Sequence, residues 1–258
     1  MSQKVNLNAD MGEGFGAYDI GNDDELLKII KSASIACGFH AGDPNVMHRM
    51  VVQAKEEGVS IGAHPGYNDL WGFGRRRMDM RPKDLEYAIA YQIGALQSMA
   101  AYVGETVTHL KPHGALSNVA AEDFDAAMAI GNAMKTVDRN IIYVALSGTE
   151  MENAAIKLDL PLAREGFPDR QYDDTGNLWS RKNAGSIISD PAVAKERAIR
   201  MVVDQEIISV NGVSVSRPVE SLCVHGDEPT SVIIAQAIRD GLEEAGIDVL
   251  PLPEMGIN

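Results

Sequence analysis

Short runs rich in apolar and β-branched residues alternate with longer amphipathic segments along almost the whole chain. Gly, Pro or polar residues bound eight runs that have the composition of β-strands, at residues 5–8, 34–37, 60–63, 107–111, 141–146, 160–165, 222–224 and 248–250. Such alternation favours parallel strands joined by crossover helices. The pattern therefore predicts an α/β fold, and the number of runs predicts a (β/α) barrel of seven or eight strands.

Two prolines mark the clearest helix starts. Pro82 precedes apolar residues that recur at helical spacing as far as Gly104, and Pro44 follows Asp43, a residue suited to cap a helix. We therefore predict helices that begin shortly after the strands end.

The chain is 258 residues long, and one (β/α) barrel commonly takes about 250 residues. We therefore assign residues 1–258 to a single barrel domain. Asn211-Gly212 lies between two short β-like runs, which is a hairpin signature. This predicts a small β-hairpin insertion near residues 207–216.

The formal net charge is −14, from 23 basic and 37 acidic residues. A field of this sign repels phosphate backbones and anionic lipids, and no apolar run is long enough to span a bilayer. The first residues also lack an apolar signal region. We expect a cytoplasmic protein that binds neither nucleic acid nor membranes. Cys37 and Cys223 form no CxxC pair, so we expect no disulfide framework.

Polar and charged side chains follow the predicted strands at the points where they end. The carboxyl ends of parallel strands open onto one mouth of a barrel, so we expect these side chains to converge there. They are Asn8, Asp10, His40, His64, Lys111, His113, Arg164, Glu165, His225 and Asp227. His48 falls within a helical segment and His109 within a strand, and we expect both to be structural.

Two long loops leave the predicted mouth, at residues 64–77 and 164–181. Each combines glycines with a tryptophan and several arginines, a composition suited to a lid that also holds an anion such as a small carboxylate. The same arginines could instead pair with nearby aspartates on the surface. The sequence does not choose between these roles.

Nucleotide-binding motifs receive little support. Residues 10–17 contain G-x-G-x-x-A after a strand, but the nearby acidic residues Asp10, Glu13 and Asp19 would oppose a pyrophosphate. A Walker A loop is absent, because the sequence contains no Gly-Lys pair. If ATP is used, this chain does not bind it through a P-loop.

Six segments together resemble the motifs of the LamB/YcsF family, which is the family of the A subunit of 5-oxoprolinase. They lie, in family order over nearly the whole chain, at residues 6–14, 35–44, 61–67, 109–116, 164–170 and 223–227. The resemblance implies a fold related to the glycoside hydrolase and deacetylase barrels. It also implies ATP-coupled opening of 5-oxo-L-proline, a cyclic amide, to L-glutamate. ATP would then be a co-substrate of a complex with two partner subunits that resemble the halves of an allophanate-hydrolase-like protein.

Opening a lactam requires charge stabilisation at its oxygen, an activated water and a proton for its nitrogen. We assign Asp10 or Glu165 as the base, Lys111 with His113 as the groups that stabilise the oxyanion or an attached phosphate, and His64 as the proton donor. The sequence allows these roles to be exchanged. The side chains predicted to bind substrate are Asn8, His40, Arg164, His225 and Asp227.

Two other functions use the same residues differently. Asp10, His40 and His64 could bind a divalent metal that activates water, which would make the chain a metal-dependent deacetylase or amidase. The chain could also be a non-catalytic scaffold within a larger complex. Such a scaffold, however, has no need of a cluster of His, Lys and carboxylate side chains facing inward.

Overall fold

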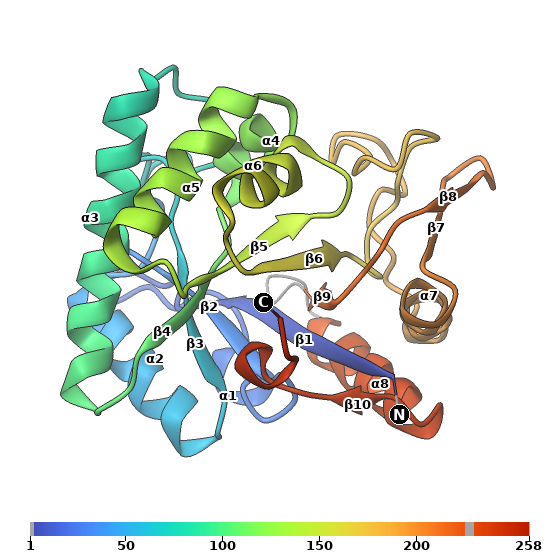
Figure 1. The fold of residues 1–258 in the computed structure, drawn as a ribbon. Helices are drawn as coiled ribbons and strands as arrows, with labels where there is room; N and C mark the ends of the chain where they lie inside the picture. Colours follow the sequence, from blue (N-terminus) through green and yellow to red (C-terminus); the bar gives the residue numbers. More distant parts are fainter. Residues whose placement is uncertain (1–2, 225–229, 258) are drawn as a thin grey trace.

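The computed structural model describes residues 3–224 and 230–257. Seven parallel strands close into a barrel in the order β1-β2-β3-β4-β5-β6-β9, and β9 pairs back with β1 (Figure 1). The barrel predicted from the sequence is confirmed, with seven strands in the ring. These strands are β1 (Lys4–Met11), β2 (Ser32–Ala36), β3 (Ser60–His64), β4 (Val107–Leu110), β5 (Ile142–Leu146), β6 (Leu162–Gly166) and β9 (Ser221–Val224).

The eighth predicted strand is present but does not enter the ring. β10 (Asp248–Val249) pairs with Lys4 and Val5, the first two residues of β1. The pairing of β1 with β2 begins only at Asn8, and its pairing with β9 begins at Asn6. β10 therefore extends the sheet beyond the amino-terminal end of the barrel.

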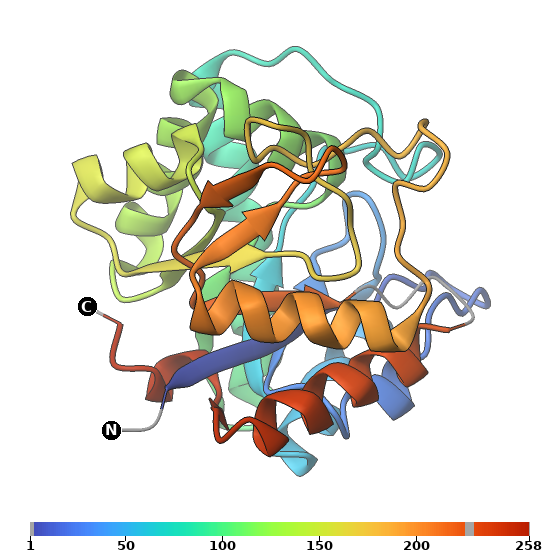
Figure 2. The same ribbon diagram turned by 90° about the vertical axis from the view of Figure 1, so that its right-hand side faces the viewer.

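Helices surround the barrel, and α7 and α8 lie together on the side that faces the viewer in Figure 2. Both described ends of the chain lie at the left of that view, whereas the long loops 65–81 and 167–190 lie toward the right. Within the described ranges, no helix is long and apolar enough to cross a membrane. The helices are α1 (Asp23–Leu26), α2 (Pro44–Glu56), α3 (Pro82–Tyr102), α4 (Gly114–Glu122), α5 (Phe124–Asp138), α6 (Glu150–Leu158), α7 (Pro191–Val203), α8 (Ser231–Glu244) and the 3-10 helix η1 (Leu252–Glu254).

The predicted helix starts are confirmed. The carboxylate of Asp43 accepts the backbone N–H groups of Asn45 and Val46, and Pro44 is the first residue of α2. Pro82 likewise opens α3. The Asp43 cap fixes the start of α2 and so anchors the loop between β2 and α2, which carries His40.

β1 alternates between two environments. Leu7 and Ala9 belong to the main apolar core, whereas Asn6 and Asn8 face the barrel interior. There Asn6 Nδ2 donates to Ser32 Oγ at 2.7 Å, and Ser221 Oγ donates to Asn6 Oδ1 at 2.9 Å. A hydrogen-bonded polar layer therefore joins β1 to β2 and β9 inside the barrel.

The other half of the barrel interior is apolar. Ile142 and Val144 of β5 pack with Ala163 of β6 and with Leu252 of η1. The N–H of Leu252 donates to Ser32 Oγ at the start of β2, so η1 closes the amino-terminal end of the barrel. η1 fills the amino-terminal end of the barrel, so a ligand would reach the interior from the carboxyl end of the strands.

A two-stranded hairpin lies outside the barrel, at the right of Figure 1. β7 (Glu206–Ile208) pairs antiparallel with β8 (Ser214–Ser216), and Gly212 in the connection has a φ of +81°. A positive φ of this size favours glycine, which explains the Asn-Gly signal. The assignment of residues 1–258 to one domain stays a prediction.

The polar layer inside the barrel predicts a stability effect. Asn6→Ala removes the partner of Ser32, Ser221 and the carbonyl of Leu250 in a fully buried position. We expect the free energy of unfolding to fall by about 3 kcal/mol, since buried donors and acceptors lose their partners. Urea unfolding checks this, with Asn153→Ala on the exposed face of α6 as the control. Equal unfolding free energies for the two variants would show that the polar layer does not stabilise the barrel.

Candidate active site

The carboxyl ends of the barrel strands open into one cavity of about 540 Å³. Its lining includes all five residues predicted to be catalytic, Asp10, His64, Lys111, His113 and Glu165. Asp10, His64 and Glu165 belong to β1, β3 and β6, and Lys111 and His113 directly follow β4. The structure thus brings these residues together at the mouth where the strand pattern predicted them.

The side chain of Lys111 lies at the floor of the cavity, with only 5% of its surface exposed. Its Nζ lies 2.6 Å from Asp10 Oδ1 and 3.4 Å from Glu165 Oε1. It also donates to Asn8 Oδ1 at 3.0 Å and to Cys223 Sγ at 2.9 Å. Three strands of the ring, β1, β6 and β9, therefore supply the groups that surround one ammonium.

These contacts decide the charge states of the floor. Burial acts to lower the pKa of Lys111, but the negative charges around it, with Asp10 first, hold the pKa well above its usual value. Burial raises the pKa of Glu165, although Lys111 and Asn8 act in the opposite direction. Lys111 is therefore a permanent cation, and Glu165 takes up a proton more readily than an ordinary glutamate.

Hydrogen bonds to two backbone carbonyls orient the rings of His64 and His113. His64 Nδ1 donates to the carbonyl of Lys111 at 2.7 Å, and His113 Nε2 donates to the carbonyl of Phe73 at 2.8 Å. An imidazole in its neutral form that donates from one ring nitrogen carries a lone pair on the other. The other nitrogens here, His64 Nε2 and His113 Nδ1, lie 3.0 Å apart.

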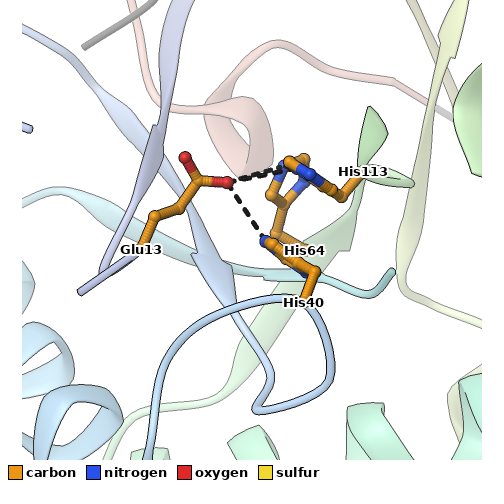
Figure 3. Close-up of side chains that lie close together, drawn as sticks. All are labelled: Glu13, His40, His64 and His113. Carbon is orange, nitrogen blue, oxygen red and sulfur yellow. Dashed lines mark hydrogen bonds and ion pairs between the residues drawn. The ribbon is translucent and has the colours of Figure 1, made fainter. Parts of the chain in front are cut away.

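A carboxylate faces the same two lone pairs. Glu13 Oε1 lies 3.1 Å from His113 Nδ1 and 3.9 Å from His64 Nε2 (Figure 3). His40 Nε2 lies 3.1 Å from the same oxygen, and the His40 ring stacks on that of His113 with 3.6 Å between centres. Burial lowers the pKa of His40 to about 3, so its ring is neutral near pH 7.

Glu13, His40, His64 and His113 each offer one ligand atom, and these atoms all lie within 4.8 Å of one another. Electron pairs that point at one another in a buried place repel unless a cation lies between them. Three imidazoles and one carboxylate are a donor set suited to Zn²⁺. The residues therefore fit a divalent metal, and we call them the His/Glu cluster.

The His/Glu cluster differs from the metal set predicted from the sequence. It keeps His40 and His64 but has Glu13 and His113 in place of Asp10. Asp10 instead bridges two groups, with Oδ1 at Lys111 and Oδ2 at 3.3 Å from His64 Nε2. Its side chain is 19% exposed, compared with 3% for Glu165.

Arg164 does not reach the cavity, contrary to its predicted substrate-binding position. Its guanidinium pairs with Glu152 at 2.7 Å and Glu220 at 3.1 Å, and it is absent from the cavity lining. The physical reason is the two-residue period of a strand, which turns Arg164 outward because Glu165 points inward.

The remaining predicted residues divide into three groups. Asn8 lies beneath Lys111 and donates to Glu165 Oε1 at 2.9 Å. His225 and Asp227 lie outside the described residues. His48 is exposed on α2, and His109 is buried in β4, as expected of structural histidines.

Sequence reasoning missed several residues of the cavity. Glu13 and Asp23 line it but lie beyond β1, in a loop and at the start of α1. Burial raises the pKa of Asp23 to about 7, which is typical of groups at functional sites. Arg75, Arg170 and Arg181 also line the cavity. They come from the two loops predicted to form a lid, but no pattern in the sequence singles them out.

A closed parallel barrel with charged side chains at the carboxyl ends of its strands is the architecture of a (β/α)-barrel enzyme. Within that class, the chain belongs to the LamB/YcsF family, whose family model matches residues 5–256. The resemblance found in the sequence is thereby confirmed.

Relatives and solved structures agree with this family. A protein from Rhodopseudomonas palustris (strain BisB18), named as the A subunit of 5-oxoprolinase, is 49% identical over 248 residues, which cover 96% of this chain and 97% of that protein. The crystal structure of a lactam utilization protein from Thermus thermophilus is 42% identical, with a TM-score of 0.92 over 96% of this chain and 100% of that one.

A more distant structure shares the fold alone. The catalytic domain of a peptidoglycan N-acetylglucosamine deacetylase from Eubacterium rectale is 14% identical, with a TM-score of 0.52 over 99% of this chain and 91% of that one. The predicted relation to deacetylase barrels is therefore confirmed at the level of architecture.

The His/Glu cluster predicts metal binding. Chelator-treated protein titrated with Zn²⁺ in a calorimeter should bind about one equivalent, because the four donors serve a single ion. Glu13→Gln and His64→Ala should each weaken binding by about tenfold or more, whereas His48→Ala on the exposed face of α2 should not change it. If unmodified protein binds no Zn²⁺, a shared proton holds the cluster together, and His64 remains the predicted proton donor.

Proposed function

We propose that this chain opens 5-oxo-L-proline to L-glutamate, as one component of an enzyme complex that couples the reaction to ATP hydrolysis. The names of the relatives support the substrate: one is named as the A subunit of 5-oxoprolinase, and a structural neighbour is called a lactam utilization protein. The observation that carries the proposal is the buried Lys111 ammonium, which lies at the cavity floor between two carboxylates.

Lys111 is suited to the carbonyl side of the reaction. An amide carbonyl is a poor electrophile, so its oxygen must be stabilised as negative charge develops during attack. The ammonium of Lys111 is held by several strands, which fixes it before the substrate arrives. A fixed cation in a site shielded from water stabilises charge more than the same cation in water does.

Asp10 is better placed than Glu165 to act as the base. Its side chain is the more exposed of the two, and it lines the cavity beside His64. Glu165 is enclosed by Asn8 and Lys111 and keeps the ammonium in position. Asp10 would take a proton from the attacking water and return it to the ring nitrogen when the C–N bond breaks.

The His/Glu cluster adds a role for a divalent cation. Such an ion would supply Lewis acidity, polarising the amide carbonyl or lowering the pKa of a bound water. Glu13, His40, His64 and His113 would hold it, so we assign His64 and His113 to metal binding within the proposal. Their hydrogen bonds to the carbonyls of Lys111 and Phe73 orient the two rings for that task.

A second candidate function is hydrolysis of an acyclic amide, such as an acetamide. The His/Glu cluster favours it, because a divalent cation held by these four residues would supply Lewis acidity for amide hydrolysis without ATP. Substrate preference separates the two candidates.

ATP coupling implies partner subunits. A five-membered lactam closes with a large intramolecular advantage, so its opening needs a coupled reaction to proceed far. The sequence holds no P-loop, so we propose that two further subunits, resembling the halves of an allophanate-hydrolase-like protein, handle the nucleotide. The cytoplasmic location stays a prediction.

The first test measures glutamate and ADP with this chain alone, with the partners alone and with all three components. We expect both products only from the complete mixture, because this chain has no P-loop for nucleotide. Stoichiometric formation of both products by the chain alone would refute the requirement for partner subunits. Rapid hydrolysis of an acetamide by the chain without ATP would favour the second candidate.

A second test replaces Lys111 by methionine. We expect turnover by the complex to fall by about a hundredfold or more, because the cation facing the carbonyl is lost. Partner binding should persist, and His48→Gln on the exposed face of α2 should keep full activity. A fully active Lys111→Met complex would leave the chain with the role of a scaffold.

The same variant should show a characteristic dependence of stability on pH. Without Lys111, the buried Glu165 has an even stronger tendency to hold its proton, so its folded-state pKa lies above its unfolded value of about 4.3. The variant's deficit in unfolding free energy should therefore grow as the pH rises above that value, and shrink in mild acid. Denaturant unfolding over a pH series measures this, and a deficit that does not change with pH would contradict the burial of Glu165.

A further inference from the structure

Arg170 is a buried arginine on the wall of the cavity. It follows β6 in the loop 167–190, and only 6% of its surface is exposed. It lines the same cavity as Lys111 and Asp10. Burying a guanidinium costs free energy unless its donors and its charge are matched, so its partners matter.

The contacts of Arg170 leave part of its guanidinium unused. Nη2 donates to the carbonyl of Trp179 at 3.0 Å, whereas Nε has no hydrogen-bond partner within the described part of the chain. Burial lowers the pKa of Arg170, and the positive charge of Arg181 acts in the same direction, whereas the carboxylate of Asp169 acts in the opposite one. Two neighbouring cations that line a cavity are stabilised when an anion enters it.

The loop holds Arg170 in place before any ligand arrives. Arg197 Nη2 donates to the carbonyl of Arg170 at 2.8 Å, and Arg197 Nε donates to that of Pro168 at 3.2 Å. The N–H of Phe167 donates to the hydroxyl of Tyr172 at 2.6 Å. A side chain on a fixed backbone loses little entropy when it binds, which favours specific recognition.

Arg170 shares its cavity with the proposed reaction centre, because Lys111 and Asp10 line it as well. The other basic side chains of the cavity wall differ from it. Arg75, Arg181 and Lys182 are exposed, and Arg75 lies over the ring of Phe73.

We infer that Arg170, assisted by Arg181, binds the carboxylate of a small cyclic amide acid and so selects it over a lactam without a carboxylate. The inference rests on the proposed function and adds a specificity determinant to it. The fork of N–H donors on a guanidinium matches the two oxygens of a carboxylate. The amide carbonyl of the same ligand would then face Lys111 on the floor.

Calorimetric titration of the purified chain with three ligands tests the inference. They are 5-oxo-L-proline, 2-pyrrolidinone, which lacks the carboxylate, and cyclopentanecarboxylate, which lacks the amide. We expect 5-oxo-L-proline to bind about tenfold or more tightly than 2-pyrrolidinone. Arg170→Gln should remove this preference and Arg170→Lys should keep part of it, because lysine retains the charge but loses the fork. Arg139→Gln, at an exposed arginine paired with Asp159, is the matched control and should bind as the unmodified chain does.

Each outcome decides a separate point. Equal binding of 5-oxo-L-proline and 2-pyrrolidinone, or binding of neither, overturns the carboxylate site, and this comparison needs no variant. A folded Arg170→Gln protein that keeps the full preference also overturns it. Cyclopentanecarboxylate could also bind as tightly as 5-oxo-L-proline and lose affinity in Arg170→Gln. That result would support carboxylate binding by Arg170 but contradict the proposal that the substrate is a lactam.

Discussion

The ammonium of Lys111 lies inside the barrel, where an unmatched charge would cost several kcal/mol. The groups that match it come from β1, β6 and β9, which are far apart in the chain. None of these strands can surround the ammonium until β9 pairs with both β6 and β1. Closing the ring therefore also assembles the catalytic floor around Lys111.

The same constraint explains why half of the barrel interior is polar. Asn8 both accepts from Lys111 and donates to Glu165, so it must itself be held. Its Nδ2 also donates to Ser221 Oγ at 2.9 Å and to the carbonyl of Leu222 at 3.2 Å. Ser221 in turn donates to Asn6, which reaches the base of the barrel. A buried network is stabilising only when its members are satisfied, so the polar layer below the cavity exists to support the charge above it. The apolar half near β5 and β6 provides the packing that the polar half cannot.

The sequence predicted the barrel and most of the cavity floor for one physical reason: strand ends in a parallel barrel share a mouth. The same reasoning failed for Arg164, because it placed two successive strand residues in one site although their side chains must point in opposite directions. Glu13 was missed as a ligand because it lies beyond the end of β1, where no periodicity indicates direction. Arg170 could not be told apart from the other loop arginines, since its burial depends on Arg197 and Tyr172 fixing the loop.

Charges of opposite sign are concentrated in different parts of the cavity, with basic residues on the loops and carboxylates at the strand ends. The chain carries a net charge of −14, so an anionic substrate approaches against the overall field. The basic residues Arg75, Arg170 and Arg181 belong to the loops, at the wall of the cavity, whereas the carboxylates of Asp10 and Glu165 lie at the floor beside Lys111. A ligand that carries one anionic and one neutral polar end is then oriented before it reacts, because its carboxylate is attracted by the loops and repelled by the floor. A neutral amide carbonyl meets no such repulsion and can approach the single ammonium at the floor, so the charge pattern itself sets the direction in which a lactam acid enters.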